Sequence, residues 1–366
     1  MRVVVVSKAL VVGTYQRKME ELARCPGVEL ACIVPPCWHD HGRPIPLERV
    51  HTRGYELIVE PIRFSGRFHL FHFPGLRRRL QALRPEVVHI DEEPYNLATF
   101  LAARDARDVG ARSLFFTWQN LHRRYPPPFR WMEQTVFRWC QWAIAGNKEA
   151  AEVLRRKGFR HPISVIPQFG VDPDVFAETP PPAAPPYVVG YVGRLVEEKG
   201  LLVLLDAVAP IEEEWRLEIV GGGPLAPLIE RRATALGVGD RVRLRPAVPS
   251  VEVPRLLASF HLLVLPSLTR PNWKEQFGRV LIEAMSVGRP VIGSDCGEIP
   301  SVVGDAGLVV PEGDREALRE ALRRLMRDAE LRDALAKRGR ARVLTHFTHA
   351  RIAQETARTY QRLLAL

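Results

Sequence analysis

Two carboxylates eight positions apart, Glu275 and Glu283, flank the stretch of this chain that is best suited to hold a ligand. Between them lie Phe277, Gly278 and the apolar run Val280–Met285, which predicts a short buried helix that begins at Gly278. On a continuous helix the two carboxylates would lie roughly 80° apart and about 12 Å along the axis. That separation is too large for an acid/base pair on one atom and fits the two ends of an extended ligand.

The start of this predicted helix offers free N–H groups, which suit a phosphate or a sugar oxygen. A carboxylate can accept both hydroxyls of a ribose diol, so Glu283 is the candidate for a ribose and Glu275 for a second polyol. The alternative is a pair of surface glutamates beside an ordinary core helix.

Two cations, Arg194 and Lys199, lie in the loop after the predicted strand Tyr187–Val192. Two cations at this spacing, in a loop between a strand and a helix, can hold a diphosphate. In the alternative interpretation Lys199 pairs with Glu197 or Glu198 and Arg194 is solvated.

The N-terminal half places further polar groups directly after predicted strands. Gly13 follows the strand Val3–Val6, in a loop where it either lets the backbone approach a phosphate or makes a simple turn. The strands Val87–Ile90 and Ser113–Thr117 are followed by Glu92, Glu93, Gln119 and Asn120. The carboxyl ends of parallel strands meet at one edge of a sheet, so these side chains are either ligand contacts or helix caps.

Two α/β cycles must position these groups, because buried β-branched runs alternate with helical stretches as in parallel sheets. Further strands are expected over residues 28–34, 56–60, 143–145, 163–166, 217–220, 241–244, 261–266 and 290–292. Helices are expected over 16–24, 76–83, 97–109, 130–142 and 201–209, with a charged helical region over 315–366. The chain thus divides into a domain over 1–170, a stiff proline-rich linker over 171–186 and a second domain over 187–349.

The charge of the chain is concentrated in its first half. Residues 1–165 carry 26 Lys and Arg against 16 Asp and Glu, whereas residues 166–366 carry 26 against 26. This asymmetry predicts an anionic partner for the first half, which can be nucleic acid, a membrane surface or an acidic substrate.

The composition indicates a cytoplasmic protein. The apolar runs are too short for a transmembrane helix. The first residues resemble a strand more than a signal peptide, because Lys8 interrupts their apolar run. Five cysteines without a Cys-x-x-Cys pair indicate a reducing compartment.

Two motifs point to other chemistry. Four potential metal ligands fall within ten residues: Cys32, Cys37, His39 and His41. The alternative for Cys32 is a core residue inside a strand. The run Gly221–Ala226 follows a strand with the G-x-G-x-x-A spacing of a dinucleotide-binding fingerprint. The acid that this fingerprint places after the next strand is missing, since Arg245 stands there.

In their order along the chain, the motifs of the second half resemble those of the family 4 glycosyltransferases, which have the GT-B fold and retain the anomeric configuration. The resemblance rests on Gly193-Arg194 with Lys199-Gly200, Gly221 to Pro224, Leu265-Pro266-Ser267, Glu275 to Met285, Gly288 to Ile292 and Gly304 to Pro311. It implies an α/β fold of two Rossmann-like, doubly wound domains facing across a cleft. The last helix, roughly residues 350–366, would cross back onto the N-terminal domain.

The resemblance also implies roles for the candidate residues. Arg194 and Lys199 would bind the donor diphosphate as part of the catalytic group, together with Glu275 at the donor sugar. The remaining donor contacts would be Gly13, Gly193, Phe277, Gly278 and Glu283, with Glu92, Glu93, Gln119 and Asn120 on the acceptor side.

The implied donor is a UDP- or GDP-linked hexose, and the implied acceptor is a glycan, a lipid or a small molecule. The charge that grows on the leaving diphosphate can be neutralised by Arg194, Lys199 and the helix start at Gly278 without Mg²⁺, so neither metal nor cofactor is expected. Three alternatives remain open: a sugar-nucleotide epimerase on the same fold, a dinucleotide-dependent oxidoreductase, and a nucleic-acid-binding protein. The last would rest on scattered basic residues that form no known binding module, so no nucleic acid is expected.

A basic and aromatic stretch, Arg63–Arg79, combines four Phe with five Arg inside the basic half. Such interleaving suits an anionic membrane surface, with the rings at the headgroup boundary and the guanidiniums on phosphates. In the alternative the Phe side chains lie in the core and Arg77–Arg79 line a solvated helix face. The hypothesis is a peripheral protein on the cytoplasmic leaflet that glycosylates a lipid or lipid-linked acceptor.

Overall fold

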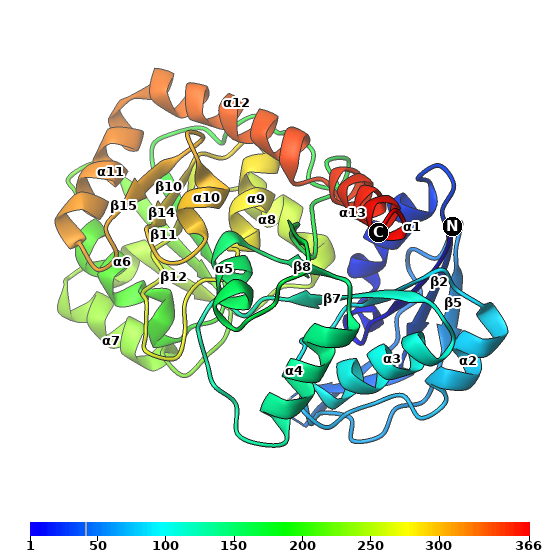
Figure 1. Cartoon of the computed structure of the whole chain (residues 1–366). Helices are drawn as coiled ribbons and strands as arrows, with labels where there is room; N and C mark the ends of the chain where they lie inside the picture. Colours follow the sequence, from blue (N-terminus) through cyan, green and yellow to red (C-terminus); the bar gives the residue numbers. More distant parts are fainter. Residues whose placement is uncertain (41) are drawn as a thin grey trace. The chain divides into compact units, whose positions relative to one another are not determined.

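A computed structural model of the chain describes residues 1–40 and 42–366, and within it the chain divides into two compact units (Figure 1). The first unit consists of Met1–Phe169 together with His349–Leu366, and the second of Gly170–Thr348. Each unit is built on one parallel sheet, which confirms the predicted α/β class.

The first unit holds a seven-stranded parallel sheet in the order β5-β2-β1-β6-β7-β8-β9. Its strands are β1 (Arg2–Val6), β2 (Glu29–Val34), β5 (Glu56–Val59), β6 (Val87–Ile90), β7 (Arg112–Thr117), β8 (Trp142–Ala145) and β9 (Ile163–Val165). The valines of β1 alternate between two buried clusters, Val3 and Val5 in one and Val4 and Val6 in the other. Their unbroken apolar run is therefore explained by burial on both faces of the sheet.

Helices cover both faces of this sheet. Side chains of α2 (Leu76–Leu83), α3 (Leu97–Asp108), α4 (Phe129–Trp139) and α5 (Lys148–Arg156) pack in the cluster that contains Val4. Side chains of α1 (Arg17–Ala23) and of the last helix, α13 (His349–Leu364), pack in the cluster that contains Val3. In Figure 1 the red last helix lies beside the blue α1, so the C-terminus completes the core of the first unit.

The second unit holds a six-stranded parallel sheet in the order β12-β11-β10-β13-β14-β15. Its strands are β10 (Tyr187–Val192), β11 (Trp215–Val220), β12 (Val242–Arg245), β13 (Leu262–Leu265), β14 (Val291–Ser294) and β15 (Leu308–Val310). Its helices are α6 (Leu201–Val208), α7 (Ala226–Ala235), α8 (Val253–Ala258), α9 (Arg279–Ser286), α10 (Ile299–Val303), α11 (Arg315–Arg327) and α12 (Ala329–His346). Helix α6 contacts α7 and α11, whereas α9 contacts α8, α10 and α12.

The proline-rich segment before β10 packs on the second unit. Val171 donates its N–H to the carbonyl of Phe347 at 2.8 Å. The buried guanidinium of Arg289 donates to the carbonyls of Thr179 at 3.0 Å and Pro180 at 2.8 Å. The segment is thus bonded to the rest of the second unit at Val171 and again at Thr179 and Pro180, where the proline run begins.

Several expectations differ from the structure in detail. The helix expected over residues 130–142 ends at Trp139, because Trp142 already begins β8. The sequence did not predict α5 or the antiparallel pair β3 (Cys37–Asp40) and β4 (Arg43–Pro46). Among the described residues, no helix is long and apolar enough to cross a membrane, and all five cysteines are free thiols.

Candidate active site

The loops at the carboxyl edge of the second unit's sheet bring Lys199 and Glu275 together. Lys199 ends a short 3-10 turn after β10, and Glu275 lies in the loop between β13 and α9. The Lys199 Nζ lies 2.5 Å from the Glu275 Oε2, and the hydroxyl of Ser267 donates to the same carboxylate oxygen at 2.9 Å. The two charged side chains are only 13% and 10% exposed, so they form a nearly buried ion pair rather than two surface charges. An ammonium has three N–H donors, so this pairing leaves Lys199 able to bind a ligand oxygen as well.

Glycines let these loops pack against one another. Gly200 has a φ of +67°, and a Cβ there would lie 1.9 Å from the carbonyl oxygen of Pro266. Gly297, after β14, has a φ of +58°, and a Cβ there would lie 2.2 Å from the carbonyl oxygen of Glu275. That same carbonyl accepts the N–H of Glu298 at 3.1 Å. The position of Glu275 is therefore fixed by its backbone as well as by Lys199.

Helix α9 begins as the sequence predicts. Its N-cap, Gly278, has a left-handed backbone with a φ of +74°, and it offers no side chain to the first turn. Phe277 is 8% exposed, and its ring packs edge-on to that of Phe347. The N-terminal turn of α9 thus follows directly on the loop that carries Glu275, which places a helix N-terminus next to the ion pair.

Glu283 lies in the middle of α9 and is buried. Its carboxylate accepts from the Nε of Arg279, one turn earlier, at 3.0 Å. Burial raises the pKa of the Glu283 carboxyl, and the charge of Arg279 opposes that shift. The side chain is therefore an acceptor that already has one cationic partner, and its role toward a ribose stays a prediction.

Arg194 differs from Lys199 in its exposure. Its side chain is 65% exposed and lies 3.5 Å from the Glu198 carboxylate, four residues on. The alternative interpretation of the two cations is therefore half right: Arg194 is solvated beside Glu198, whereas Lys199 pairs with Glu275 and not with its sequence neighbours.

The glycines of the apparent dinucleotide fingerprint have a packing role. A Cβ at Gly221 would lie 1.8 Å from the carbonyl oxygen of Gly193, and one at Gly223 would lie 2.3 Å from that of Leu195. Gly193 in turn donates its N–H to the carbonyl of Val220 at 3.0 Å. The two loops after β10 and β11 therefore pack backbone to backbone, which explains the glycines without a dinucleotide.

The first unit contains the remaining candidates. Gly13 donates its N–H to the Glu48 carboxylate at 2.6 Å, and a Cβ on Gly13 would lie 2.3 Å from a methyl carbon of Val50. A carboxylate of the protein thus occupies the position that a phosphate was expected to take. Its assignment to the donor site stays a prediction.

A network of buried charges lies at the carboxyl edge of the first unit's sheet. After β6, the Asp91 carboxylate accepts from the Ser7 hydroxyl at 2.8 Å and from the Gln168 amide at 2.9 Å. Glu92 forms an ion pair with Lys8, which follows β1. Burial raises the pKa values of both carboxyls. These acids connect the ends of neighbouring strands.

Glu93 joins β6 to β7 in the same way. It accepts from the Thr117 hydroxyl at 2.6 Å and from the N–H of Trp118 at 2.8 Å. Burial raises the pKa of the Glu93 carboxyl to about 7, against the effect of these two hydrogen bonds. Glu92 and Glu93 are thus brought to one sheet edge, as predicted, and each bonds to the end of a neighbouring strand; their contact with an acceptor stays a prediction.

The two amide candidates bind different partners. Gln119 accepts from the Lys157 ammonium at 2.7 Å and donates to the hydroxyl of Tyr125 at 3.0 Å. Lys157 also pairs with Glu133 at 2.6 Å, and both of these side chains are at most 5% exposed. The amide of Asn120 donates to Glu149 at 3.3 Å. Gln119 therefore belongs to a buried network that the sequence analysis missed.

One signal in the sequence pointed to the missed residues. The chain has 52 Lys and Arg, and nearly all of them are arginines, so each lysine is an exception. Four of these exceptions have little exposure and lie at the sheet edges described above or beneath them: Lys8, Lys18, Lys157 and Lys199. A compact ammonium fits a confined pocket of oxygens better than a wide guanidinium does, which accounts for this choice.

The conceivable metal site does not form in the described part of the chain. Cys32 is a core residue of β2, and the ring Nδ1 of His39 lies 2.9 Å from the Ser65 hydroxyl. His41 lies outside the described residues. Within those that are described, no group of three or more His, Cys, Asp or Glu is placed to hold a metal ion.

Comparison with known families matches the two halves of the chain separately. Residues 19–175 match the model described as Glycosyltransferase Family 4, and residues 176–342 match that of Glycosyl transferases group 1. The two matches adjoin and together reach across nearly the whole chain. The chain therefore belongs to the family 4, or group 1, glycosyltransferases.

Individual relatives agree with this assignment. The alpha-D-kanosaminyltransferase of Streptomyces kanamyceticus is 32% identical over 41% of this chain, but over only 39% of its own length. The lipopolysaccharide core biosynthesis glycosyltransferase LpsE of Rhizobium meliloti is 30% identical over 63% of this chain and 66% of its own. Among solved structures, HepE of Anabaena in complex with UDP and glucose has a TM-score of 0.71 at 16% identity and covers 99% of both chains. At that identity the likeness shows the fold, GT-B, and no more.

Proposed function

We propose that this chain transfers a hexose from a UDP- or GDP-linked donor to an acceptor hydroxyl, with retention of the anomeric configuration. The observation that carries the proposal is the nearly buried pair of Lys199 and Glu275 beside the N-terminus of α9. Membership of the glycosyltransferase family gives this arrangement its interpretation. The structural relative HepE, which binds UDP and glucose, supports a nucleotide sugar as the donor.

The proposed chemistry breaks the bond between the anomeric carbon and the diphosphate oxygen. The electron pair leaves with the diphosphate, and Arg194, Lys199 and the N–H groups at the start of α9 neutralise the charge that grows there. The sugar becomes oxocarbenium-like and is attacked by the acceptor oxygen on the same face. The acceptor proton passes to the leaving phosphate oxygen, so the step requires neither a protein base nor a metal ion.

Thermal unfolding in the presence of UDP-, GDP- and ADP-sugars tests the donor. A donor at 100 times its dissociation constant stabilises the folded protein by about 2.7 kcal/mol, which raises the unfolding midpoint by several degrees. The matching free sugars serve as the control. If no nucleotide sugar raises the midpoint, the proposed donor class is wrong.

A product assay separates the transferase from the nearest alternative. A sugar-nucleotide epimerase would change the donor with no acceptor present, whereas the transferase should leave the sugar intact until an acceptor hydroxyl is added. Chromatography of the donor in the absence of any acceptor distinguishes the two activities. Added EDTA should leave the transfer rate unchanged if no metal takes part.

For the acceptor, we propose a lipid or lipid-linked glycan at an anionic membrane surface. The support comes from the stretch Arg63–Arg79, where Phe64 and Phe68 are 52% and 49% exposed. The other two rings correct the sequence-based hypothesis, because Phe71 and Phe73 are core residues. Arg77 and Arg79 also pair with acids of the same unit, Asp108 and Glu60. The proposed membrane contact is therefore residues 63–68, where two exposed rings, Phe64 and Phe68, each follow an exposed arginine.

Sedimentation with liposomes tests this contact. Binding should require anionic lipid, weaken as salt rises, and fall when Arg63 and Arg67 are both replaced by Glu. A matched control replaces Arg156 and Arg160, which are exposed in the same unit, by Glu and so makes the same charge change elsewhere. Equal loss of binding in both double variants would mean that only net charge matters. If the protein sediments equally with neutral and anionic vesicles, the proposed contact with an anionic membrane is wrong, and a soluble acceptor is favoured.

A further inference from the structure

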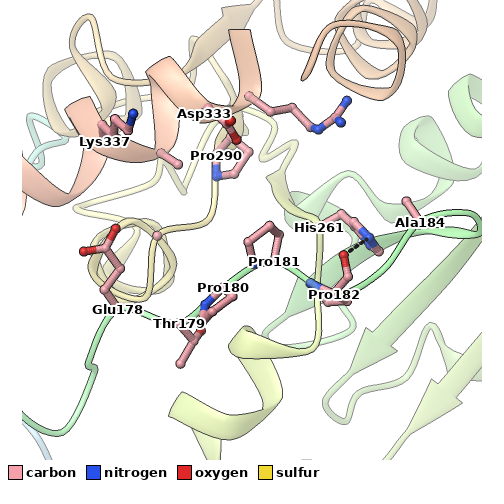
Figure 2. A pocket seen from close by; sticks show the side chains of 13 residues that line it. Glu178, Thr179, Pro180, Pro181, Pro182, Ala184, His261, Pro290, Asp333 and Lys337 are labelled. Atoms are coloured by element: carbon pink, nitrogen blue, oxygen red, sulfur yellow. Dashed lines mark hydrogen bonds between the residues drawn. The ribbon is translucent and has the colours of Figure 1, made fainter. Parts of the chain in front are cut away.

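A cavity lies at the opposite edge of the second unit's sheet from the candidate active site. Its volume is about 610 Å³, within the usual range for small-ligand sites. His261 and Pro290, which line it, stand directly before β13 and β14, so the cavity is at the amino ends of these strands. One wall is the proline run Pro180–Pro182, and the other is α12, with Asp333 and Lys337 (Figure 2).

Hydrogen bonds from Arg289 and His261 hold the proline wall in place. Arg289, which is 1% exposed, donates to the Thr179 hydroxyl at 2.8 Å and to the carbonyl of Pro180 at 2.8 Å. His261 accepts the N–H of Val188 on its Nδ1 at 2.8 Å, so its Nε2 carries the proton and donates to the carbonyl of Pro182 at 3.1 Å. Figure 2 marks this second bond by a dashed line. With its wall bonded at both ends, the cavity is formed before any ligand arrives.

The charged side chains of the cavity are available to a ligand. Within the part of the chain that the structure describes, no hydrogen bond or ion pair engages the carboxylates of Glu178 and Asp333 or the ammonium of Lys337. The fourth charge, Arg332, is partly used, because its Nη1 donates to the carbonyls of Leu325 and Met326 and its guanidinium lies over the ring of Tyr187. The cavity therefore presents two carboxylates and one ammonium without partners among the described residues, beside the wall of proline rings.

We propose that this cavity binds a neutral sugar unit, either free or at the end of a glycan. The two acids and the two bases of the lining balance, so neither a diphosphate nor a simple cation is favoured by net charge. A ligand must instead offer donors to two carboxylates and an acceptor to Lys337, and its less polar side must cover the prolines. A pyranose does all three, because its vicinal hydroxyls both donate and accept while its C–H face is apolar.

This site is separate from the donor site and does not depend on the proposed transfer reaction. It can be tested without any nucleotide, by saturation-transfer NMR of the full chain with four probes: the methyl α-glycosides of glucose, mannose, galactose and N-acetylglucosamine. At least one probe should bind saturably. Asp333→Asn and Lys337→Gln should each weaken that binding tenfold or more, and Ala336→Trp, which fills the cavity, should abolish it.

Matched variants give the controls. Arg338→Gln changes a neighbouring exposed cation that does not line the cavity, and Lys199→Ala alters the other edge of the sheet; both should leave the affinity unchanged. Because Asp333 and Lys337 are exposed, their variants should fold normally, which the thermal midpoint checks. The proposal is overturned if no probe binds, if the three cavity variants keep full affinity, or if Lys199→Ala removes the signal.

Discussion

The loops at the carboxyl edges of the two sheets are held in place by different interactions. In the second unit the edge is shaped by backbone, with Gly200, Gly278 and Gly297 in left-handed conformations beside the nearly buried ion pair of Lys199 and Glu275. In the first unit the edge is held by side chains, where the three acids that follow β6 bond to groups directly after β1 and at the end of β7. Glycines fix a shape at little electrostatic cost, whereas buried charges fix it only while every partner remains.

Because of this difference, we expect mutations at the two edges to affect different properties of the protein. Arg194 is largely exposed and Lys199 has donors to spare, so changes in the second unit's edge should act mainly on ligand binding and catalysis. The ion pair of Lys157 and Glu133 is almost fully buried, so changes there should act mainly on folding. The following predictions test whether the two edges can be told apart in this way.

The largest effect is expected from Lys157→Met. The substitution leaves the Glu133 carboxylate buried without its cation, and breaking a buried pair from one side costs about 3–5 kcal/mol. Urea unfolding should show the loss. Lys148→Met, at an exposed lysine of the same unit, is the control and should change stability by less than about 0.5 kcal/mol. A loss below about 1 kcal/mol in Lys157→Met would show that this edge is not held by its buried charges.

The substitutions Arg194→Ala and Lys199→Ala should have an effect of similar size, but on the activation free energy of the reaction and not on the free energy of unfolding. Each removes a cation from the diphosphate that leaves, so kcat/KM should fall about 10²- to 10³-fold. Because Arg194 is 65% exposed, its variant should unfold within about 0.5 kcal/mol of the parent. Arg231→Ala, at an exposed arginine on α7, controls for charge. Near-normal rates in both variants would remove these residues from the catalytic group.

The elements of the fold could be predicted because they depend on local pattern. The strands Val87–Ile90 and Tyr187–Val192 and the helix Leu76–Leu83 have the predicted bounds, since apolar runs and amphipathic spacing mark them clearly. The charged region after Arg315 could be predicted only as helical. The start of each helix within this region depends on a capping aspartate. The side chains of Asp314 and Asp328 accept the N–H groups of Ala317 and Leu331, which fixes where α11 and α12 begin.

The partners within the site could not be predicted, because they are distant in sequence. Lys199 and Glu275 were each identified as candidates, but 76 residues separate them and nothing local indicates the pair. Nothing local indicates the contact between Gln119 and Lys157 either, because they are 38 residues apart, and Lys157 was not among the candidates. The sequence identified residues able to do the chemistry, and the sheet order decided which of them meet.

A smaller effect is expected from Gly297→Ala, which alters the site without altering its charges. The residue has a φ of +58°, and the new Cβ would meet the carbonyl oxygen of Glu275 at 2.2 Å. Strain of this kind costs about 1–3 kcal/mol and should also lower the transfer rate by displacing Glu275. Gly222→Ala is the control, since a Cβ there meets nothing within 4 Å and its backbone is not left-handed. If both variants behave alike, backbone geometry does not position Glu275.

The smallest effect is expected from Glu93→Gln and appears only as a change with pH. Burial raises the pKa of Glu93 to about 7, well above its value in the unfolded chain, so the folded state keeps a proton that the unfolded state loses. The stabilisation from that proton is complete below the unfolded pKa and is lost as pH rises toward 7, with a slope of at most about 1.4 kcal/mol per pH unit. Gln cannot titrate. Its carbonyl oxygen can accept from the N–H of Trp118, while its NH2 group takes the place of the oxygen that accepts from Thr117 and can donate to that hydroxyl oxygen instead, so the variant should lose this slope. Unfolding by urea from pH 5 to pH 8 measures the difference between the two proteins, and parallel curves would mean that Glu93 is ionised in the folded state throughout.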